Sequence, residues 1–285
     1  MSTPRKLAAL PFDVRPGEVA CNLALVRGAI EQAADAGAGL LLLPEKWTTS
    51  FLPSYDAATI AASEAALQEA HALAASLELT VVGSAPSGSG PNGKPYNQVH
   101  HLGAGGLHRP YSKRVLFSPT GEGRQVARGE GRAQAIETAV GAGMTLVCYD
   151  LRFPELTRDA FYQQVDFLLV PAQWPHPRTA VWELLCRGRA AENQQWLLSC
   201  NRAGQAGLDG KHLMDFPGTA LLIDPYGEVA ARRDDGGMLI AEADLAVSAE
   251  CRKRVPCLRD LKMASLVPPH VDSPESTQET GAGDR

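Results

Sequence analysis

The chain has 285 residues, of which 45% are hydrophobic and 21% charged, a composition typical of a globular protein with a substantial core. Its 27 Lys and Arg residues against 32 Asp and Glu residues give a formal net charge of −5, which argues against a nucleic-acid partner. The apolar stretches near the N-terminus and at 40–44 are too short for a signal peptide or a membrane span. We therefore expect a cytoplasmic protein without membrane contact.

Short apolar runs alternate with longer segments of helical period through the first half of the chain. Leu40 to Leu43 form a continuous apolar run that Pro44 ends, as expected for a strand covered on both faces. The glycine-rich segment 87–95 predicts a turn. We predict helices over 19–34 and 57–77, and strands at 6–10, 40–43, 80–83, 96–102 and 107–111.

The second half continues the same alternation after a Gly-rich, charged loop at 118–131. We predict helices over 154–163 and 179–193, and strands at 134–138, 144–147, 167–171, 196–200, 219–223, 228–231 and 238–243. Since no repeat or linker interrupts the pattern, we expect one α/β domain over residues 1–266. Prolines followed by small and polar residues predict a disordered tail over 267–285.

Three chemically active side chains each follow an apolar strand: Glu45, Lys113 and Cys148. Ligands of α/β proteins bind beyond the carboxyl ends of the strands, so we expect these side chains to converge. Cys148 is one of six cysteines without a CxxC pair, and the seven histidines lack the spacing of metal ligands. No P-loop motif occurs either, so the sequence indicates neither a metal nor a nucleotide cofactor.

Three segments resemble the signature segments of the nitrilase (carbon-nitrogen hydrolase) superfamily, and together they carry Glu, Lys and Cys in the family's order. They are LLLPEKW at 41–47, YSKRVLFSPTGE at 111–122 and LVCYDLRFPE at 146–155. The segments 171–204 and 224–229 resemble the omega-amidase-like branch. The resemblance spans about residues 6 to 260. It implies a four-layer α-β-β-α sandwich that forms a homodimer through its outer helices.

The resemblance also assigns roles to the three residues. Cys148 would attack an amide carbonyl to give a thioester and ammonia, with Glu45 as general base. Lys113 and the backbone N–H of Tyr149 would face the oxyanion. Glu122 matches a second family glutamate that holds the lysine and orients substrate, although an exposed loop carboxylate is the alternative for its Gly-rich surroundings.

Each candidate also has a structural alternative. Without the motif, Cys148 would be a buried packing residue, and Lys113 a surface residue beside Arg114. Trp174 is a candidate pocket wall or a core residue, and Arg178 a partner for a substrate carboxylate or a surface residue. Val115 departs from the family, which often has His at that place. A structural role in the turn after the nucleophile is preferred for three further residues: Asp150, Arg152 and Glu155.

We therefore predict an amidase that hydrolyses a small ω-amide such as 2-oxoglutaramate or succinamate. A nitrilase or an N-carbamoyl hydrolase would use the same three residues. A catalytically silent binding protein of this fold is an alternative of a different class. A redox sensor is disfavoured because no second cysteine lies near Cys148 in the sequence.

Overall fold

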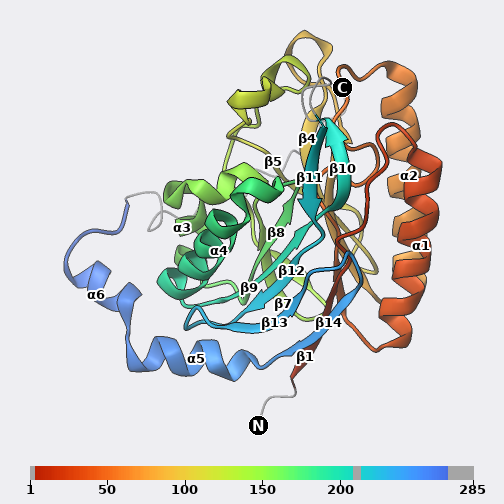
Figure 1. Cartoon of the computed structure of the whole chain (residues 1–285). Helices are drawn as coiled ribbons and strands as arrows, with labels where there is room; N and C mark the ends of the chain where they lie inside the picture. Colours follow the sequence, from red (N-terminus) through yellow and green to blue (C-terminus); the bar gives the residue numbers. More distant parts are fainter. Residues whose placement is uncertain (1–3, 208–212, 269–285) are drawn as a thin grey trace, which may run out of the picture.

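The computed structural model describes residues 4–207 and 213–268. Two six-stranded sheets pack face to face between two pairs of helices (Figure 1). The first sheet has the strand order β14-β1-β2-β3-β4-β5, and the second has the order β13-β12-β9-β8-β7-β6. Each sheet thus has a central group of parallel strands with antiparallel strands at both edges.

The first sheet is built mainly from the N-terminal half of the chain. Its parallel strands are β1 (Arg5–Ala9), β2 (Leu40–Leu42) and β3 (Thr80–Ser87), followed by antiparallel β4 (Tyr96–Leu102) and β5 (His108–Ser112). The crossover helices α1 (Val19–Asp35) and α2 (Ala57–Ser76) cover its outer face. Asp56 caps α2 by accepting a hydrogen bond from the Thr59 backbone N–H at 2.7 Å. Strand β14 (Leu239–Ala243) returns late in the chain to pair with β1.

The second sheet repeats this plan. Strands β7 (Gly141–Thr145), β8 (Phe167–Ala172) and β9 (Trp196–Asn201) are parallel, and β6 (Ile136–Thr138) pairs antiparallel with β7. Strands β12 (Ala220–Ile223) and β13 (Val229–Arg233) complete the other edge. Helices α3 (Pro154–Tyr162) and α4 (Thr179–Asn193) cover the outer face.

Three apolar layers hold the four structural layers together. One lies between the first sheet and α1 and α2, and another between the second sheet and α3 and α4. The third lies between the sheets, where Leu40, Leu42 and Val82 meet Phe167, Leu169 and Leu198. Continuous apolar strands such as β2 and β8 are needed because both of their faces are covered. The predicted four-layer α-β-β-α sandwich is confirmed.

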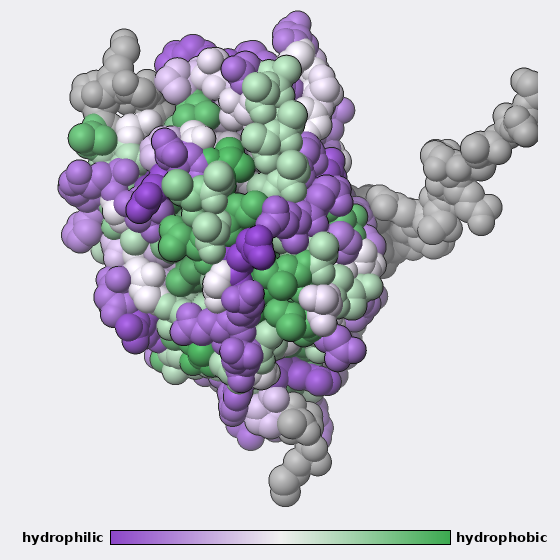
Figure 2. All heavy atoms as spheres, turned by 90° about the vertical axis from the view of Figure 1, so that its right-hand side faces the viewer, coloured by the Kyte–Doolittle hydropathy of each residue, from purple (hydrophilic) through white to green (hydrophobic). Residues whose placement is uncertain are grey.

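The outer surface of α1 and α2 mixes hydrophilic side chains with interspersed hydrophobic ones (Figure 2). Its larger exposed apolar residues include Leu25, which is 46% exposed. In the part of the chain that the structure describes, no helix combines the length and the apolar character needed to cross a bilayer.

Some elements differ from the sequence prediction. Strands β10 (Ala203–Gly207) and β11 (Leu213–Pro217) form a separate hairpin, and helices α5 (Leu245–Arg254) and α6 (Cys257–Met263) follow β14. None of the four has the apolar period of a core element; α5 buries only Ser248 and Cys251. Of the predicted tail, 267–285, residues 269–285 lie outside the described residues.

Candidate active site

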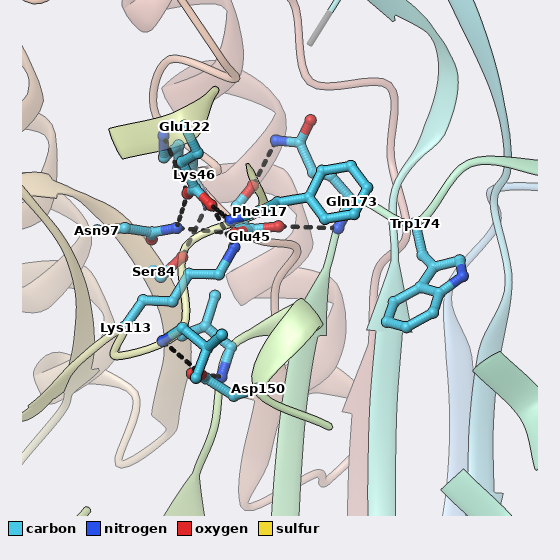
Figure 3. A network of polar contacts seen from close by, with 12 residues as sticks. Glu45, Lys46, Ser84, Asn97, Lys113, Phe117, Glu122, Asp150, Gln173 and Trp174 are labelled. Carbon is cyan, nitrogen blue, oxygen red and sulfur yellow. Dashed lines mark hydrogen bonds and ion pairs between the residues drawn. The ribbon is translucent and has the colours of Figure 1, made fainter. Parts of the chain in front are cut away.

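Five strands deliver polar side chains to one edge of the sandwich. Glu45 follows β2 and Lys113 follows β5 in the first sheet. In the second sheet, β7 leads to Cys148, β8 leads to Gln173, and β9 leads to Arg202. These strands run in the same direction within their sheets, so their carboxyl ends meet at one edge. The structure thus brings together the three residues that the sequence singled out, and Figure 3 shows the polar network around Glu45 and Lys113.

The ammonium group of Lys113 lies between two carboxylates. Its Nζ donates to Glu45 Oε1 and to Glu122 Oε2, each at 2.8 Å. Asn97 Nδ2 donates to Glu45 Oε1 at 2.7 Å, and the Phe117 N–H donates to Glu122 Oε2 at 2.8 Å. Glu122 is therefore a buried ion-pair partner and not the exposed loop carboxylate that its glycine neighbours suggested.

Burial and pairing act in opposite directions on these charges. Burial alone would lower the pKa of Lys113, but the carboxylates of Glu122 and Glu45 raise that pKa well above its usual value. Burial alone would raise the pKa of Glu122, but the ammonium groups of Lys113 and Lys46 lower it to about 2. Lys113 therefore stays cationic and Glu122 anionic at neutral pH.

Cys148 starts a 3₁₀ turn, η4 (Cys148–Arg152), with a left-handed backbone angle φ of 49°. The Glu45 side chain and the Gln173 backbone are polar groups that act on the thiol. Burial and the charge of Glu45 raise the pKa of the thiol well above its usual value, against the opposing effect of Lys113. The effect of Lys113 on the thiol pKa was expected from the sequence, but burial outweighs it. The resting thiol is therefore protonated.

Gln173 holds Glu45 in place, a role that the sequence reasoning missed. Its backbone N–H donates to Glu45 Oε2 at 3.2 Å, and its side-chain Nε2 donates to the Glu45 carbonyl at 2.6 Å. Its Oε1 accepts from Nη1 of the buried Arg202 at 3.2 Å, which fixes the orientation of the amide. The signal was present, because Gln173 follows an apolar strand as Glu45 and Cys148 do.

Asp150 ties the turn after Cys148 to the segment after Lys113. Its carboxyl group accepts from the Tyr111 hydroxyl and the Val115 N–H, each at 2.9 Å, and from the Val147 N–H at 3.2 Å. Burial raises its pKa to about 6, against the opposing charge of Lys113. These contacts fit the structural role that the sequence indicated for Asp150.

A pocket of about 170 Å³ opens in front of Cys148. Trp174 is a buried wall residue whose indole N–H donates to the Arg178 carbonyl at 3.0 Å. Tyr149 packs edge-to-face against Phe117, with ring centroids 5.0 Å apart. The exposed Arg178 stands at the pocket. The full lining is Phe117, Pro119, Cys148, Tyr149, Arg152, Gln173, Trp174, Pro175 and Arg178.

Arg152 differs from the role that the sequence suggested. Its guanidinium lies 5.1 Å from the Trp174 ring centroid and lines the pocket, so it is placed to meet a ligand. Glu155 is exposed in the first turn of α3. Within residues 4–207 and 213–268, no group of three or more His, Cys, Asp or Glu side chains is arranged to hold a metal ion.

The chain is similar to known carbon-nitrogen hydrolases over most of its length. It is 31% identical to a 2-oxoglutaramate amidase of Bacillus subtilis (strain 168), over 90% of this chain and 97% of that protein. It is 32% identical to the omega-amidase YafV of Escherichia coli (strain K12), over 79% of this chain and 84% of that protein.

The fold is also similar to that of solved amidases. A mutant amidase from Nesterenkonia sp. AN1, which carries the acetamide moiety of fluoroacetamide on its active-site cysteine, is 25% identical with a TM-score of 0.76. That match covers 90% of this chain and 96% of the Nesterenkonia chain. The family model described as carbon-nitrogen hydrolase matches residues 6–253. The family predicted from the sequence is thereby confirmed: the chain belongs to the carbon-nitrogen hydrolases of the nitrilase superfamily.

Proposed function

We propose that the protein is an amidase that hydrolyses a small ω-amide with a carboxylate at its far end, through a thioester on Cys148. The observation that carries the proposal is the pocket: the Cys148 thiol, on which the charge of Glu45 acts, lies in a small cavity whose lining also includes two arginines. Similarity to omega-amidases and 2-oxoglutaramate amidases supports the same substrate class.

Acylation would begin at the Cys148 thiol, with the Glu45 carboxylate as its base. As sulfur attacks the amide carbon, Glu45 takes the thiol proton, and the carbonyl oxygen becomes an oxyanion. Lys113 and the Tyr149 backbone N–H would stabilise that charge, with Glu45 and Glu122 holding the lysine in place. Glu45 then passes the proton to the departing nitrogen, the C–N bond breaks, and ammonia leaves behind a thioester.

Deacylation would use the same base. Glu45 removes a proton from water, the water oxygen attacks the thioester carbon, and Lys113 again faces the oxyanion. Collapse breaks the C–S bond and releases a carboxylic acid, and the proton on Glu45 returns to the sulfur. The cycle consumes one water and restores the starting charges.

The substrate assignment depends on charge and size. Arg152 and Arg178 offer guanidinium groups that bind carboxylates bidentately, while Phe117, Tyr149 and Trp174 provide apolar walls. Substrates such as 2-oxoglutaramate and succinamate carry an amide at one end and a carboxylate at the other. A neutral amide would leave the arginines without a partner.

The test is a substrate panel with ammonia detection. We expect 2-oxoglutaramate or succinamate to have a kcat/KM at least about 10²-fold above that of a neutral amide of equal length. The same panel includes nitriles and N-carbamoyl compounds. If any of these classes is the better substrate, the ω-amide assignment is wrong. Arg152→Met and Arg178→Met then identify which guanidinium contributes, because the relevant variant should lose the preference for charged substrates.

We also propose that the enzyme is a cytoplasmic homodimer that associates through outer helices. On α4, Leu184 is 70% exposed and Val181 is 40% exposed. Leu184 lines a shallow surface groove that also includes Tyr226, which is 51% exposed. Exposed apolar side chains beside a groove favour this face for association.

A further inference from the structure

Lys46, the residue after Glu45, is a second buried lysine. The resemblance to the nitrilase superfamily assigns it no role. Lys46 is 0% exposed, and its ammonium group has no hydrogen-bond acceptor among the described residues. Its Nζ lies 3.6 Å from Glu122 Oε1 and 3.9 Å from the centroid of the Phe51 ring. Tyr55 lies farther off, at 5.2 Å. Figure 3 shows Lys46 beside Glu122 in the network.

The backbone holds this lysine in a specific place. Lys46 has a left-handed φ of 47°, which is uncommon for a residue with a side chain. Its N–H donates to Ser84 Oγ at 2.9 Å, and its carbonyl accepts from the Ser50 N–H at 2.8 Å. A buried and unsatisfied ammonium is costly, so its persistence beside Glu122 calls for a compensating electrostatic role.

Counting charges suggests what that role is. Glu45 and Glu122 are two carboxylates bonded to Lys113, and Lys46 is the second ammonium that balances them. When the Cys148 thiol proton moves to Glu45, the negative charges are the thiolate and Glu122, and the positive charges are still Lys113 and Lys46. The net charge of this cluster is therefore zero before and after the transfer. Without Lys46, the cluster would carry a net negative charge in a buried environment, which favours proton uptake.

Other groups face the cluster without contacting Lys46. Asp150 interacts electrostatically with Lys113 and is held by Tyr111, Val115 and Val147. Arg202 bonds to Gln173, which in turn bonds to Glu45. Asn97 donates to both carboxylates but carries no charge.

We propose that Lys46 is a positioning residue that keeps Glu122 and Glu45 ionised together on Lys113, which leaves Glu45 able to accept the thiol proton. The inference rests on the proposed roles of Glu45 and Cys148. It does not depend on the identity of the amide substrate.

The test measures two pH profiles in wild type and Lys46→Met. The first is kcat/KM for amide hydrolysis. The second is the rate at which iodoacetamide alkylates Cys148, measured by peptide mass spectrometry; it needs Glu45 as base but no substrate. In Lys46→Met, which lacks the buried positive charge, the acid limb of both profiles should move to higher pH. Activity should then already fall at a pH at which wild type is still active. We expect a shift of about one pH unit or more, with a smaller change in KM than in kcat.

Two control variants separate charge from packing. Lys46→Arg keeps the positive charge and should leave the acid limb close to that of wild type. Lys94→Met removes a lysine that bonds to the Gly123 carbonyl at 2.9 Å, next to Glu122 but outside the buried cluster. It should leave both profiles unchanged. Asp150 also titrates on the acid side, but it is present in every variant and cancels in the comparison.

The outcomes are distinct. Acid limbs that stay in place in Lys46→Met, whatever its thermal stability, overturn the proposal. If Lys46→Met does not fold, Lys46→Asn replaces it, because Asn tolerates a left-handed backbone. If neither Lys46→Met nor Lys46→Asn folds, Lys46 is a folding residue and the proposal is rejected. Failure of wild type to hydrolyse any amide would refute the proposed function, while the alkylation profiles would still decide on Lys46.

Discussion

Burial governs the reactivity of Cys148 more strongly than its charged neighbours do. The pKa of its thiol is raised well above the usual value, although Lys113 acts to lower it. A permanent thiolate would be favoured by exposure and by nearby cations. Cys148 instead keeps its proton, and in the proposed mechanism Glu45 removes it, so the thiol should be slow to oxidise and should react mainly with a molecule seated in the pocket.

Replacing Cys148 with Ala should abolish hydrolysis and keep the fold, because only one sulfur atom is lost from the site. Intact mass after brief exposure to substrate should show an acyl adduct on wild type and none on Cys148→Ala. Cys186, which is buried and has a raised thiol pKa, supplies the control: Cys186→Ala should keep the adduct. Clear turnover by Cys148→Ala would refute the mechanism.

Gln173→Leu should lower kcat by about 10- to 10²-fold, since a small displacement of a reacting group is enough for such losses. The change removes the 2.6 Å bond to the Glu45 carbonyl and the acceptor for Arg202. Gln195→Leu is a matched control, because the amide of Gln195 is buried without a hydrogen-bond partner in the described part of the chain. Equal activity of the two variants would show that Gln173 does not position Glu45.

Helices and strands were predicted best from the sequence where one pattern of apolar residues dominated the segment. The run Leu40 to Leu43 predicted a strand covered on both sides, and the segment 179–193 predicted a helix; the structure has both. The hairpin of β10 and β11 and helix α5 were missed because their conformation depends on contacts with other parts of the molecule. Arg252 of α5, for example, donates to the carbonyls of Gln164 and Val165.

Strand β4 carries a histidine that should make the protein sensitive to acid. Burial, followed by the charges of Arg109 and His101, lowers the pKa of His100 from 6.5 to about 3. Between these values the unfolded chain binds a proton that the folded chain does not, so His100 reduces stability as the pH falls. Above the unfolded pKa this effect is absent.

Urea unfolding at neutral and mildly acidic pH checks this expectation. For each pH unit by which the pH falls, the unfolding free energy of wild type should decrease more than that of His100→Leu. The difference between the two decreases should be up to about 1.4 kcal/mol. The opposite contribution of Asp150 is common to both proteins and cancels. His108→Asn, on an exposed position of β5, should follow wild type. Parallel curves for wild type and His100→Leu would rule out the buried histidine as the cause.

On the scale of the whole molecule, the sandwich and the arrangement of Glu45, Lys113 and Cys148 could be anticipated because family motifs mark the strand ends. The contacts of Gln173, Arg202 and Lys46 could not, because each depends on partners distant in sequence. Gln173 and Glu45, for example, are 128 residues apart. Arg152 was expected to serve the local turn, whereas packing against Trp174 places it in the pocket.

The proposed dimer can be tested through α4. Leu184→Glu puts a charge on a residue that is 70% exposed, so it should not harm the fold of a single chain. If α4 forms the interface, the variant should sediment as a monomer at concentrations where wild type is a dimer. Leu25→Glu places the same charge on α1, where Leu25 is 46% exposed, and should stay dimeric. The reverse result would assign the interface to α1 and α2.

The division of the site between the two sheets has a consequence for fragments of the chain. A cut at Gly131, an exposed residue between β5 and β6, would leave Glu45, Lys113 and Glu122 on one fragment and Cys148 on the other. Strand β14 belongs to the second fragment but pairs with β1 of the first, which provides an edge for recognition. Neither fragment would hold a complete set of reacting groups. Ammonia release would therefore report their reassembly, and the protein could serve as a split enzyme whose signal appears when two fused partners meet.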